Sequence, residues 1–324
     1  LPAMRGLPEV EVRVLCDLNE EGVRRFAGEY GVEWTTSYAD VLAREDVDLV
    51  QICTPDPFHC EQTIQAAHAG KHVLCQKPIA CSVEELRRMR DAVREAGVYF
   101  QAAQNTRWTE RSLRLKALIA QGAVGDVAQV TVATKGGFFS YAAGSVYRRP
   151  DAPHQFLHNG VHWVDLASWL AGSVPVEVYG QSTRHYPTED RLPCDNYTAA
   201  SIRFAGGAFA LIEQNQMVID PPGYPPRERV IVAGTRGNLV AGNRECTTVE
   251  SFRDGRTTLE VPTNADAVPS FRRMIADFAR RILADEPPDI PIEHSMATVA
   301  TCLAAIESAR TGEPRPVPAF DGTA

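Results

Sequence analysis

Three histidines in one stretch of the sequence have a spacing that suits chemistry. His154, His158 and His162 lie four residues apart, so His158 and His162 share one face if the stretch is helical. Imidazole side chains transfer protons near neutral pH, and pairs with this spacing can also chelate zinc. His154 follows Pro153 and is expected to lie before the helix begins. We therefore predict no metal site, and expect the pair to present two groups to one pocket.

An aspartate near the start of the chain occupies the position of a dinucleotide-recognising acid. Asp17 follows the apolar run 10–16, and a carboxylate after a strand of a doubly wound sheet can bind the ribose hydroxyls of NAD. No arginine, which would accommodate the additional phosphate of NADP, follows directly. We therefore favour NAD over NADP. Asp17 or Asn19 could equally be the N-cap of the helix that follows.

The glycine-rich phosphate loop that should accompany Asp17 is not found in the sequence. Such a loop lies about 20 residues before the acid, and counting back from Asp17 runs past Leu1. The chain begins with Leu instead of Met, which favours a clipped, processed or incompletely recorded start. We expect that the first strand and its glycine-rich loop are missing for this reason. The alternative is a protein that truly lacks the loop and binds dinucleotides poorly.

Composition and charge restrict the class of protein. The 324 residues include 33 Lys and Arg against 41 Asp and Glu, a net charge of −8, which argues against nucleic acid as a partner. No apolar run reaches the roughly 18 residues that a membrane-spanning helix needs. The 8 cysteines are scattered without a CxxC pair, which is typical of reduced thiols in the cytoplasm. A cytoplasmic enzyme without a membrane partner is the prediction.

The elements that must position these groups begin with alternating strands and helices. This alternation predicts βαβ units and a doubly wound parallel sheet covered on both faces. Ser82 and Glu85 form a capping box at the start of one of the helices. The expected strands are 10–16, 47–53, 71–75 and 98–103, and the expected helices are 23–30, 58–69 and the stretch after Ser82.

After about residue 106 the pattern changes to strands with one polar face. Such strands favour a large, mostly antiparallel open sheet, and Gly206-Gly207 indicates a hairpin. We therefore predict an N-terminal Rossmann-type domain at 1–105 and a C-terminal α+β domain at 106–324, whose last helix can pack back on the first domain. The expected strands are 127–134, 174–183, 198–204, 208–216, 229–233 and 237–240, and the expected helices are 111–121, 156–170, 271–283 and 295–310.

Five short motifs occur together in the sequence: TPDPFH at 54–59, AGKHV at 69–73, QKP at 76–78, NTRW at 105–108 and GVHWVD at 160–165. Together they resemble one known family, the Gfo/Idh/MocA group of glucose–fructose oxidoreductase, inositol dehydrogenase and MocA-like proteins. The resemblance covers essentially the whole chain. It implies a nicotinamide-binding domain, hydride transfer at a hydroxyl or keto carbon of a sugar, cyclitol or related polyol, and homo-oligomers (dimers or tetramers) built through the C-terminal sheet.

The resemblance assigns the proton chemistry to Lys77, His162 and His158. A lysine can take the proton of a hydroxyl group if its pKa is lowered, although a lone lysine is usually a surface residue. His162 matches the family histidine that contacts the reacting hydroxyl. His158 stands where dehydrogenases of the family usually carry Asp, so the acidic partner that would orient His162 and raise its pKa is replaced.

Two departures from the family pattern lie on the cofactor side. Gln76 replaces the usual Glu, which either lets Lys77 lose its proton more readily or marks altered chemistry. Asp56 replaces the usual Asn and adds a negative charge near the cofactor. The predicted cofactor-binding residues are Asp17, Thr54, Pro55, Asp56, His59, Gln76, Lys77 and Asn105, and the predicted substrate-binding residues are Arg107, Trp108, Tyr147, His158, Asn159 and His162.

Three functions are consistent with these residues. The leading hypothesis is an NAD-dependent dehydrogenase or reductase that acts on CH–OH groups of a sugar, cyclitol or polyol. The second is an NAD-dependent lyase or glycosidase that oxidises a sugar transiently, without net cofactor turnover, with His158 as an additional acid–base group. The third is a non-catalytic regulator that binds a sugar or nucleotide, which is favoured if the phosphate loop is truly absent.

Overall fold

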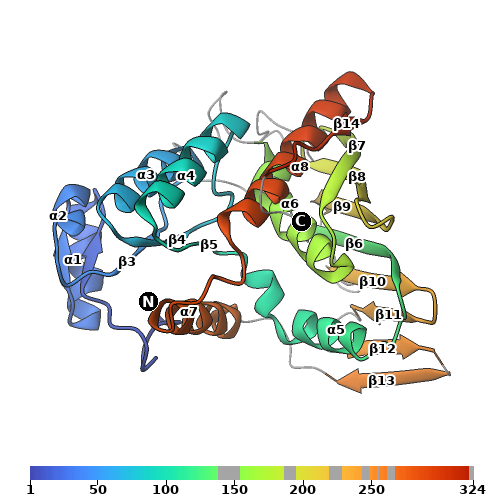
Figure 1. The fold of residues 1–324 in the computed structure, drawn as a ribbon, viewed down its shortest axis with the longest axis horizontal. Coiled ribbons are helices and arrows are strands. Elements are labelled where there is room, and N and C mark those ends of the chain that lie inside the picture. Colours follow the sequence, from blue (N-terminus) through green and yellow to red (C-terminus); the bar gives the residue numbers. More distant parts are fainter. Residues whose placement is uncertain are drawn as a thin grey trace. The chain divides into compact units, whose positions relative to one another are not determined.

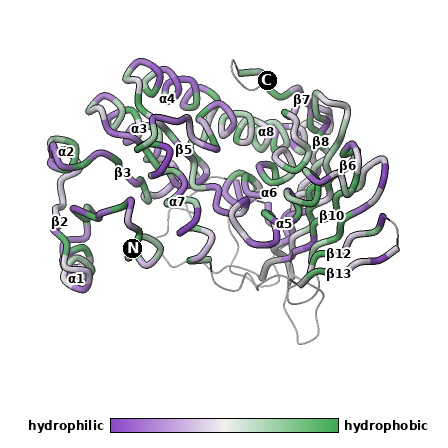
Figure 2. Tube along the Cα trace, turned by 60° about the horizontal axis from the view of Figure 1, so that its bottom comes forward, coloured by the Kyte–Doolittle hydropathy of each residue, from purple (hydrophilic) through white to green (hydrophobic). Residues whose placement is uncertain are grey.

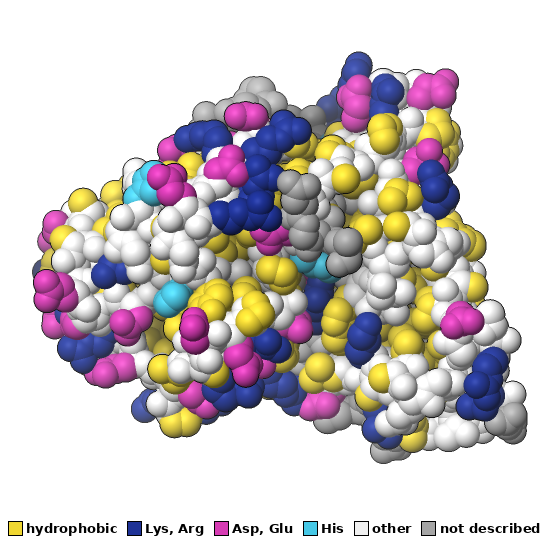
Figure 3. All heavy atoms as spheres, in the orientation of Figure 1, with side chains coloured by type: hydrophobic (Ala, Val, Ile, Leu, Met, Phe, Trp, Pro, Cys, Tyr) yellow, Lys and Arg dark blue, Asp and Glu magenta, His cyan; other side chains and the backbone are white. Residues whose placement is uncertain are grey.

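The computed structural model describes residues 1–137, 154–185, 195–218, 228–242, 248–253, 255–260 and 267–320. Contacts between backbone segments group the chain into two units (Figure 1). The first unit comprises Leu1–Ala103 and Phe271–Ile292, and the second comprises Gln104–Ser270 and Glu293–Ala324. Acidic and basic side chains are intermixed on the face shown in Figure 3.

The first unit is built on short parallel strands. β1 (Val14–Cys16) pairs with β2 (Glu33–Thr35), and β4 (His72–Cys75) lies between β3 (Leu49–Ile52) and β5 (Phe100–Ala102). Val73 and Leu74 point to opposite faces of β4 and are both fully buried, because a central parallel strand is covered on both sides.

Helices cover both faces of the β3–β4–β5 sheet: α3 and α4 lie on one side and α7 on the other (Figure 1). α4 starts at the capping box of Ser82 and Glu85, in which both reciprocal hydrogen bonds are formed. In Figure 2 hydrophobic and hydrophilic residues alternate along α4, as expected of a helix with one buried face. The helices of this unit are α1 (Glu20–Tyr30), α2 (Tyr38–Leu42), η1 (Asp56–Phe58), α3 (His59–His68), α4 (Val83–Ala96) and most of α7 (Val268–Leu283).

The second unit contains a nine-stranded sheet in the order β13-β12-β11-β10-β6-β9-β8-β7-β14. Among the described strands of this sheet, β6 and β9 are the one pair that is parallel. The strands are β6 (Val127–Gly137), β7 (Pro175–Thr183), β8 (Tyr197–Phe204), β9 (Phe209–Val218), β10 (Glu228–Gly234), β11 (Asn238–Ala241), β12 (Thr248–Phe252), β13 (Arg256–Glu260) and β14 (Arg315–Pro316).

One face of this sheet is covered by α5 (Glu110–Ala120), α6 (Gln155–Ala171) and α8 (Ile292–Thr311), with η2 (Asn105–Trp108) leading into α5 (Figure 1). α8 approaches β7 closely at Gly180. A Cβ atom there would lie 2.2 Å from the carbonyl oxygen of Ala305, so only glycine allows this packing. Val130 and Val132 of β6 are fully buried beneath the helices.

The predicted fold class is confirmed: a Rossmann-type unit with parallel strands and a second unit with a large, mostly antiparallel sheet. The domain limits stay a prediction, and Phe271–Ile292 groups with the first unit. β2, α2, β12, β13 and β14 were not predicted. They are 2–5 residues long and too short to show a repeating pattern of apolar residues. Within the described ranges no helix has the length and apolar character to cross a membrane.

Candidate active site

The loop after β4 carries the lysine predicted to transfer protons. Lys77 lies two residues after the end of β4 and precedes Pro78. Burial lowers the pKa of Lys77 to about 8, although the charge of Asp56 acts in the opposite direction. Desolvation disfavours the ammonium form of a lysine, so a larger fraction of Lys77 is neutral near physiological pH than of an ordinary lysine. The structure therefore gives Lys77 the property that a general base requires.

His59 connects the loop after β3 with the loop after β4. Its side chain is fully buried, with Nε2 2.7 Å from the carbonyl oxygen of Thr54 and Nδ1 2.7 Å from the carbonyl oxygen of Pro78. Both ring nitrogens therefore contact backbone oxygens. This arrangement gives His59 a positioning role in place of the predicted cofactor contact, because it holds together the two loops that carry Asp56 and Lys77.

The remaining residues predicted to bind cofactor on the first unit lie at strand ends. Ile52 and Cys75 are paired across β3 and β4, so Thr54 and Gln76 follow the same edge of a parallel sheet, where such sheets bind ligands. The hydroxyl group of Thr54 donates to Gln62 Oε1 at 2.6 Å. Pro55 is exposed and Gln76 is half-buried. Asp56 is only 3% exposed. Its negative charge acts on Lys77, whose pKa it raises.

Asp17 is exposed directly after β1. Its Oδ1 accepts a hydrogen bond from the backbone N–H of Asn19 at 2.8 Å, and Asn19 is the N-cap of α1. The alternative reading of Asp17 as the cap itself is therefore wrong. A carboxylate offers more acceptor sites than this one bond uses, so Asp17 can accept further hydrogen bonds.

On the second unit, one stripe of α6 is only partly buried. Among residues 155–171, the first three turns bury most side chains but leave His158, Asn159, His162 and Trp163 partly accessible. Asn159 Nδ2 donates to Gln155 Oε1 at 3.4 Å. His158 and His162 thus share one helix face, as the i, i+4 spacing predicted. His154 is the N-cap of α6, and its ring accepts from the N–H of Phe156.

The short helix η2 holds α6 through two neighbouring side chains. Thr106 Oγ1 lies 3.1 Å from His162 Nδ1. Arg107 donates from Nε and Nη2 to the carboxylate of Asp165 at 2.7 and 2.6 Å. His294 of α8 contacts both Arg107 and Asp165. Burial by itself raises the pKa of Asp165, but the charge of Arg107 and the hydrogen bonds from His294 and Arg107 outweigh it and lower the pKa.

Arg107 was predicted to contact substrate, and the structure gives it another role. Its side chain is 3% exposed and Asp165 is fully buried, so the guanidinium group pairs with a carboxylate inside the unit. Asn105, predicted to bind cofactor, donates to Ser270 Oγ at 3.0 Å. Trp108 is half-buried. Tyr147 lies outside the described residues.

Sequence reasoning did not single out Thr106, Asp165 or His294. Asp165 belongs to the GVHWVD motif at 160–165, but its buried partner Arg107 lies 58 residues away in the chain. The spacing of apolar residues within one element cannot indicate a pair that is so far apart. Within the described ranges no group of three or more His, Cys, Asp or Glu side chains is arranged to hold a metal ion. The six cysteines in the same ranges are free thiols.

Two family models match the chain. Residues 1–104 match an oxidoreductase family with an NAD-binding Rossmann fold, and residues 112–240 match the GFO/IDH/MocA C-terminal domain. The chain therefore belongs to the Gfo/Idh/MocA family and is an NAD-binding oxidoreductase. The predictions of the family, of an oxidoreductase and of NAD as cofactor are confirmed.

Known proteins similar to the chain act on sugars and polyols. The chain is 26% identical over 309 residues to the 1,5-anhydro-D-fructose reductase of Ensifer adhaerens, covering 94% of this chain and 90% of that protein. It is 25% identical over 262 residues to the myo-inositol 2-dehydrogenase of Thermotoga maritima, covering 78% and 74%. A levoglucosan dehydrogenase solved with NADH and levoglucosan has the same fold, with a TM-score of 0.86, 21% identity and coverage of 98% and 95%.

Proposed function

We propose that the protein oxidises a hydroxyl group of a sugar, cyclitol or related polyol with NAD, or reduces the corresponding ketone with NADH. The observation that carries the proposal is Lys77, which follows β4 with a pKa lowered to about 8. NAD, when bound, supplies the hydride acceptor. The similarity to the reductase of anhydrofructose and to the dehydrogenases of inositol and levoglucosan supports this class of substrate.

In this proposal the chain's own residues handle the proton. Neutral Lys77 takes the proton of the substrate hydroxyl while the C–H hydride leaves, so the alcohol becomes a ketone with release of NADH and one proton. On the second unit, His162 contacts a substrate hydroxyl and His158 provides a further acid–base group. Asn159 and Tyr147 bind further hydroxyls, and Trp108 gives an aromatic surface for a sugar ring.

On the cofactor side, we propose that Asp17 binds the adenosine ribose, which favours NAD over NADP. Thr54, Pro55 and Gln76 line the cofactor from the ends of β3 and β4. Support comes from the position of these residues at the carboxyl edge of parallel strands, where open sheets bind ligands.

The test is a substrate screen with NAD and NADP in which NADH absorbance and product are both measured. The panel contains 1,5-anhydro-D-sugars, inositols and free pyranoses. The expected result is stoichiometric NADH and ketone with at least one polyol. Conversion without net NADH would instead indicate transient oxidation, and saturable sugar binding without conversion would indicate a regulator.

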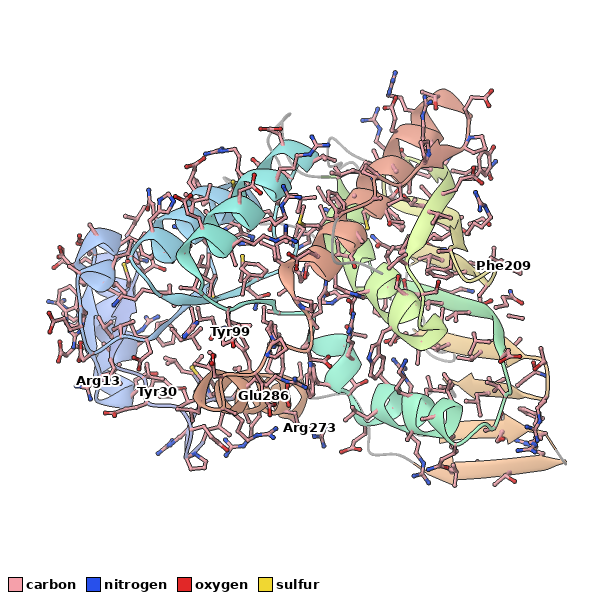
Figure 4. All side chains as sticks on the ribbon, in the orientation of Figure 1. Arg13, Tyr30, Tyr99, Phe209, Arg273 and Glu286 are labelled. Atoms are coloured by element: carbon pink, nitrogen blue, oxygen red, sulfur yellow. The ribbon has the colours of Figure 1, made fainter. Side chains whose placement is uncertain are left out.

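We also propose that the face of the nine-stranded sheet opposite α5, α6 and α8, which no described helix covers, joins two copies of the chain. Tyr179, Ser201 and Leu211 are aligned across β7, β8 and β9, and Tyr179, Phe209 and Leu211 are 38–41% exposed. Phe209 points away from α6 and α8 (Figure 4). Exposed apolar groups on a flat sheet favour association.

Light scattering after gel filtration tests the oligomer. We expect a dimer or tetramer for the wild type and a monomer for the variant Phe209→Glu/Leu211→Glu. Leu283→Glu, which changes another exposed leucine, is the control and should leave the assembly unchanged. A monomeric wild type contradicts this part of the proposal. A cytoplasmic location stays a prediction.

A further inference from the structure

His162 has a hydrogen-bond partner that its own helix does not provide. The residue one turn earlier is His158, which cannot orient the ring in the way that a carboxylate would. In the structure Thr106 Oγ1 lies 3.1 Å from His162 Nδ1. Thr106 is only 8% exposed, so its hydroxyl group has little water to exchange with.

Neighbouring hydrogen bonds hold the backbone segment that carries this hydroxyl group. The carbonyl oxygen of Thr106 accepts a hydrogen bond from Thr109 Oγ1 at 3.0 Å. The next residue, Arg107, is paired with Asp165, which lies three residues after His162 on α6. Residues 106 and 107 thus hold α6 at two points almost one turn apart. The Thr106–His162 contact is therefore part of a rigid connection between η2 and α6.

The nature of the partner determines the protonation of the ring. A neutral imidazole carries one proton, and the hydrogen bond at one nitrogen decides which nitrogen holds it. A hydroxyl group can donate or accept. If it accepts from Nδ1–H, the bond persists when Nε2 also takes a proton, because both ring nitrogens then donate. If it donates to Nδ1, the bond is lost on protonation.

We propose that Thr106 is a positioning residue that accepts the Nδ1 proton of His162 and so places the lone pair on Nε2. This inference rests on the proposed function, in which His162 meets the substrate hydroxyl. Thr106 thus orients the ring of His162 from a neighbouring element and leaves Nε2 able to accept a proton.

The direct test is the tautomer of His162 by NMR of protein labelled with ¹⁵N-histidine. The chain has 8 histidines, so the His162 signals are assigned by their loss in His162→Gln. At about pH 9, where an ordinary imidazole is neutral, we expect the proton on Nδ1 in the wild type. In Thr106→Val it should move to Nε2, because a buried N–H facing a methyl group is unsatisfied. Thr106→Ser should keep the wild-type tautomer.

Kinetics on a substrate found in the screen provide the second measurement. We expect Thr106→Val to lower kcat by about 10- to 100-fold with little change in KM, and Thr106→Ser to stay within about 3-fold of the wild type. Thr301→Val is the control. Its hydroxyl is also buried in this unit but donates to a carbonyl oxygen of its own helix, so both tautomer and kcat should be unchanged.

The two measurements separate this inference from the proposed function. An Nε2–H tautomer in the wild type, or an unchanged tautomer in Thr106→Val, overturns the role of Thr106 whatever the substrate is. An Nδ1–H tautomer that is lost in Thr106→Val supports the role of Thr106, even if no polyol is turned over. A shift in tautomer with unchanged kcat on a true substrate shows that the ring orientation does not serve catalysis, and the inference is then wrong.

Discussion

The side chains proposed for acid–base chemistry have different environments in the two units. In the first unit the pKa of Lys77 is lowered to about 8, chiefly by burial, with Asp56 acting in the opposite direction. In the second unit His162 contacts a neutral hydroxyl on η2, next to the pairing of Arg107 with Asp165. The lysine is thus affected mainly by desolvation, whereas the histidine has a directed hydrogen bond to a neighbouring side chain. Solvation acts on any group in the environment, whereas a hydrogen bond depends on one partner at one distance.

The largest effect is expected at Lys77. Lys77→Met keeps the length and apolar stem of the side chain but removes the group that accepts a proton. We expect kcat to fall by about 10³-fold, with NADH binding by fluorescence nearly unchanged. Lys71→Met, whose amine donates to the carbonyl oxygen of Arg44, is the matched control and should retain activity. Wild-type kcat in Lys77→Met would remove Lys77 from the proton transfer.

The next effect concerns the buried ion pair of the second unit. Arg107→Leu leaves the fully buried carboxylate of Asp165 without its main counter-charge. The free energy of unfolding should fall by about 3–5 kcal/mol, measured by urea denaturation. Arg203→Leu breaks an exposed pair with Glu177 and should cost about 1 kcal/mol or less. Equal losses in the two variants would contradict the role assigned to the buried pair.

A smaller effect is expected for the cofactor preference. Asp17→Ala removes the carboxylate proposed to bind the ribose hydroxyls, so NADH affinity should fall about 10-fold while NADPH binding weakens less or improves. Titration of both cofactors by fluorescence measures the ratio. Glu21→Ala, an exposed acid in the first turn of α1, should leave the ratio unchanged. If Glu21→Ala also changes the ratio of NADH to NADPH affinity, the change in net charge accounts for the effect of Asp17→Ala.

The smallest effect is expected in the pH dependence of the reaction, which reports on Lys77. Because the neutral amine is the base, kcat/KM for alcohol oxidation should rise with pH and level off above about 8. The charge of Asp56 raises the pKa of Lys77, so Asp56→Asn should move this midpoint to lower pH by less than about one unit. A profile that stays in place, or moves to higher pH, would show that another group titrates.

Much of the architecture could be predicted from local patterns. The alternation of strands and helices, the capping box at Ser82 and the turn at Gly206-Gly207 each depend on residues close together in the chain, so the sequence indicates them directly. The i, i+4 spacing of His158 and His162 was enough to place both on one face of α6. The motif with Lys77 indicated the family, which two family models confirm.

Only the tertiary structure decided how the candidate residues are used. The partners of His162 and Asp165 lie 56 and 58 residues away, and His294 reaches Asp165 from 129 residues away. The spacing of residues within one helix or strand does not indicate such pairs, because they form only when separate elements pack against one another. Arg107 was predicted to contact substrate, but it is buried and is the counter-ion of Asp165. Burial also lowers the pKa of Lys77. The sequence determined which chemical groups are available, and packing determined their charge, orientation and access to solvent.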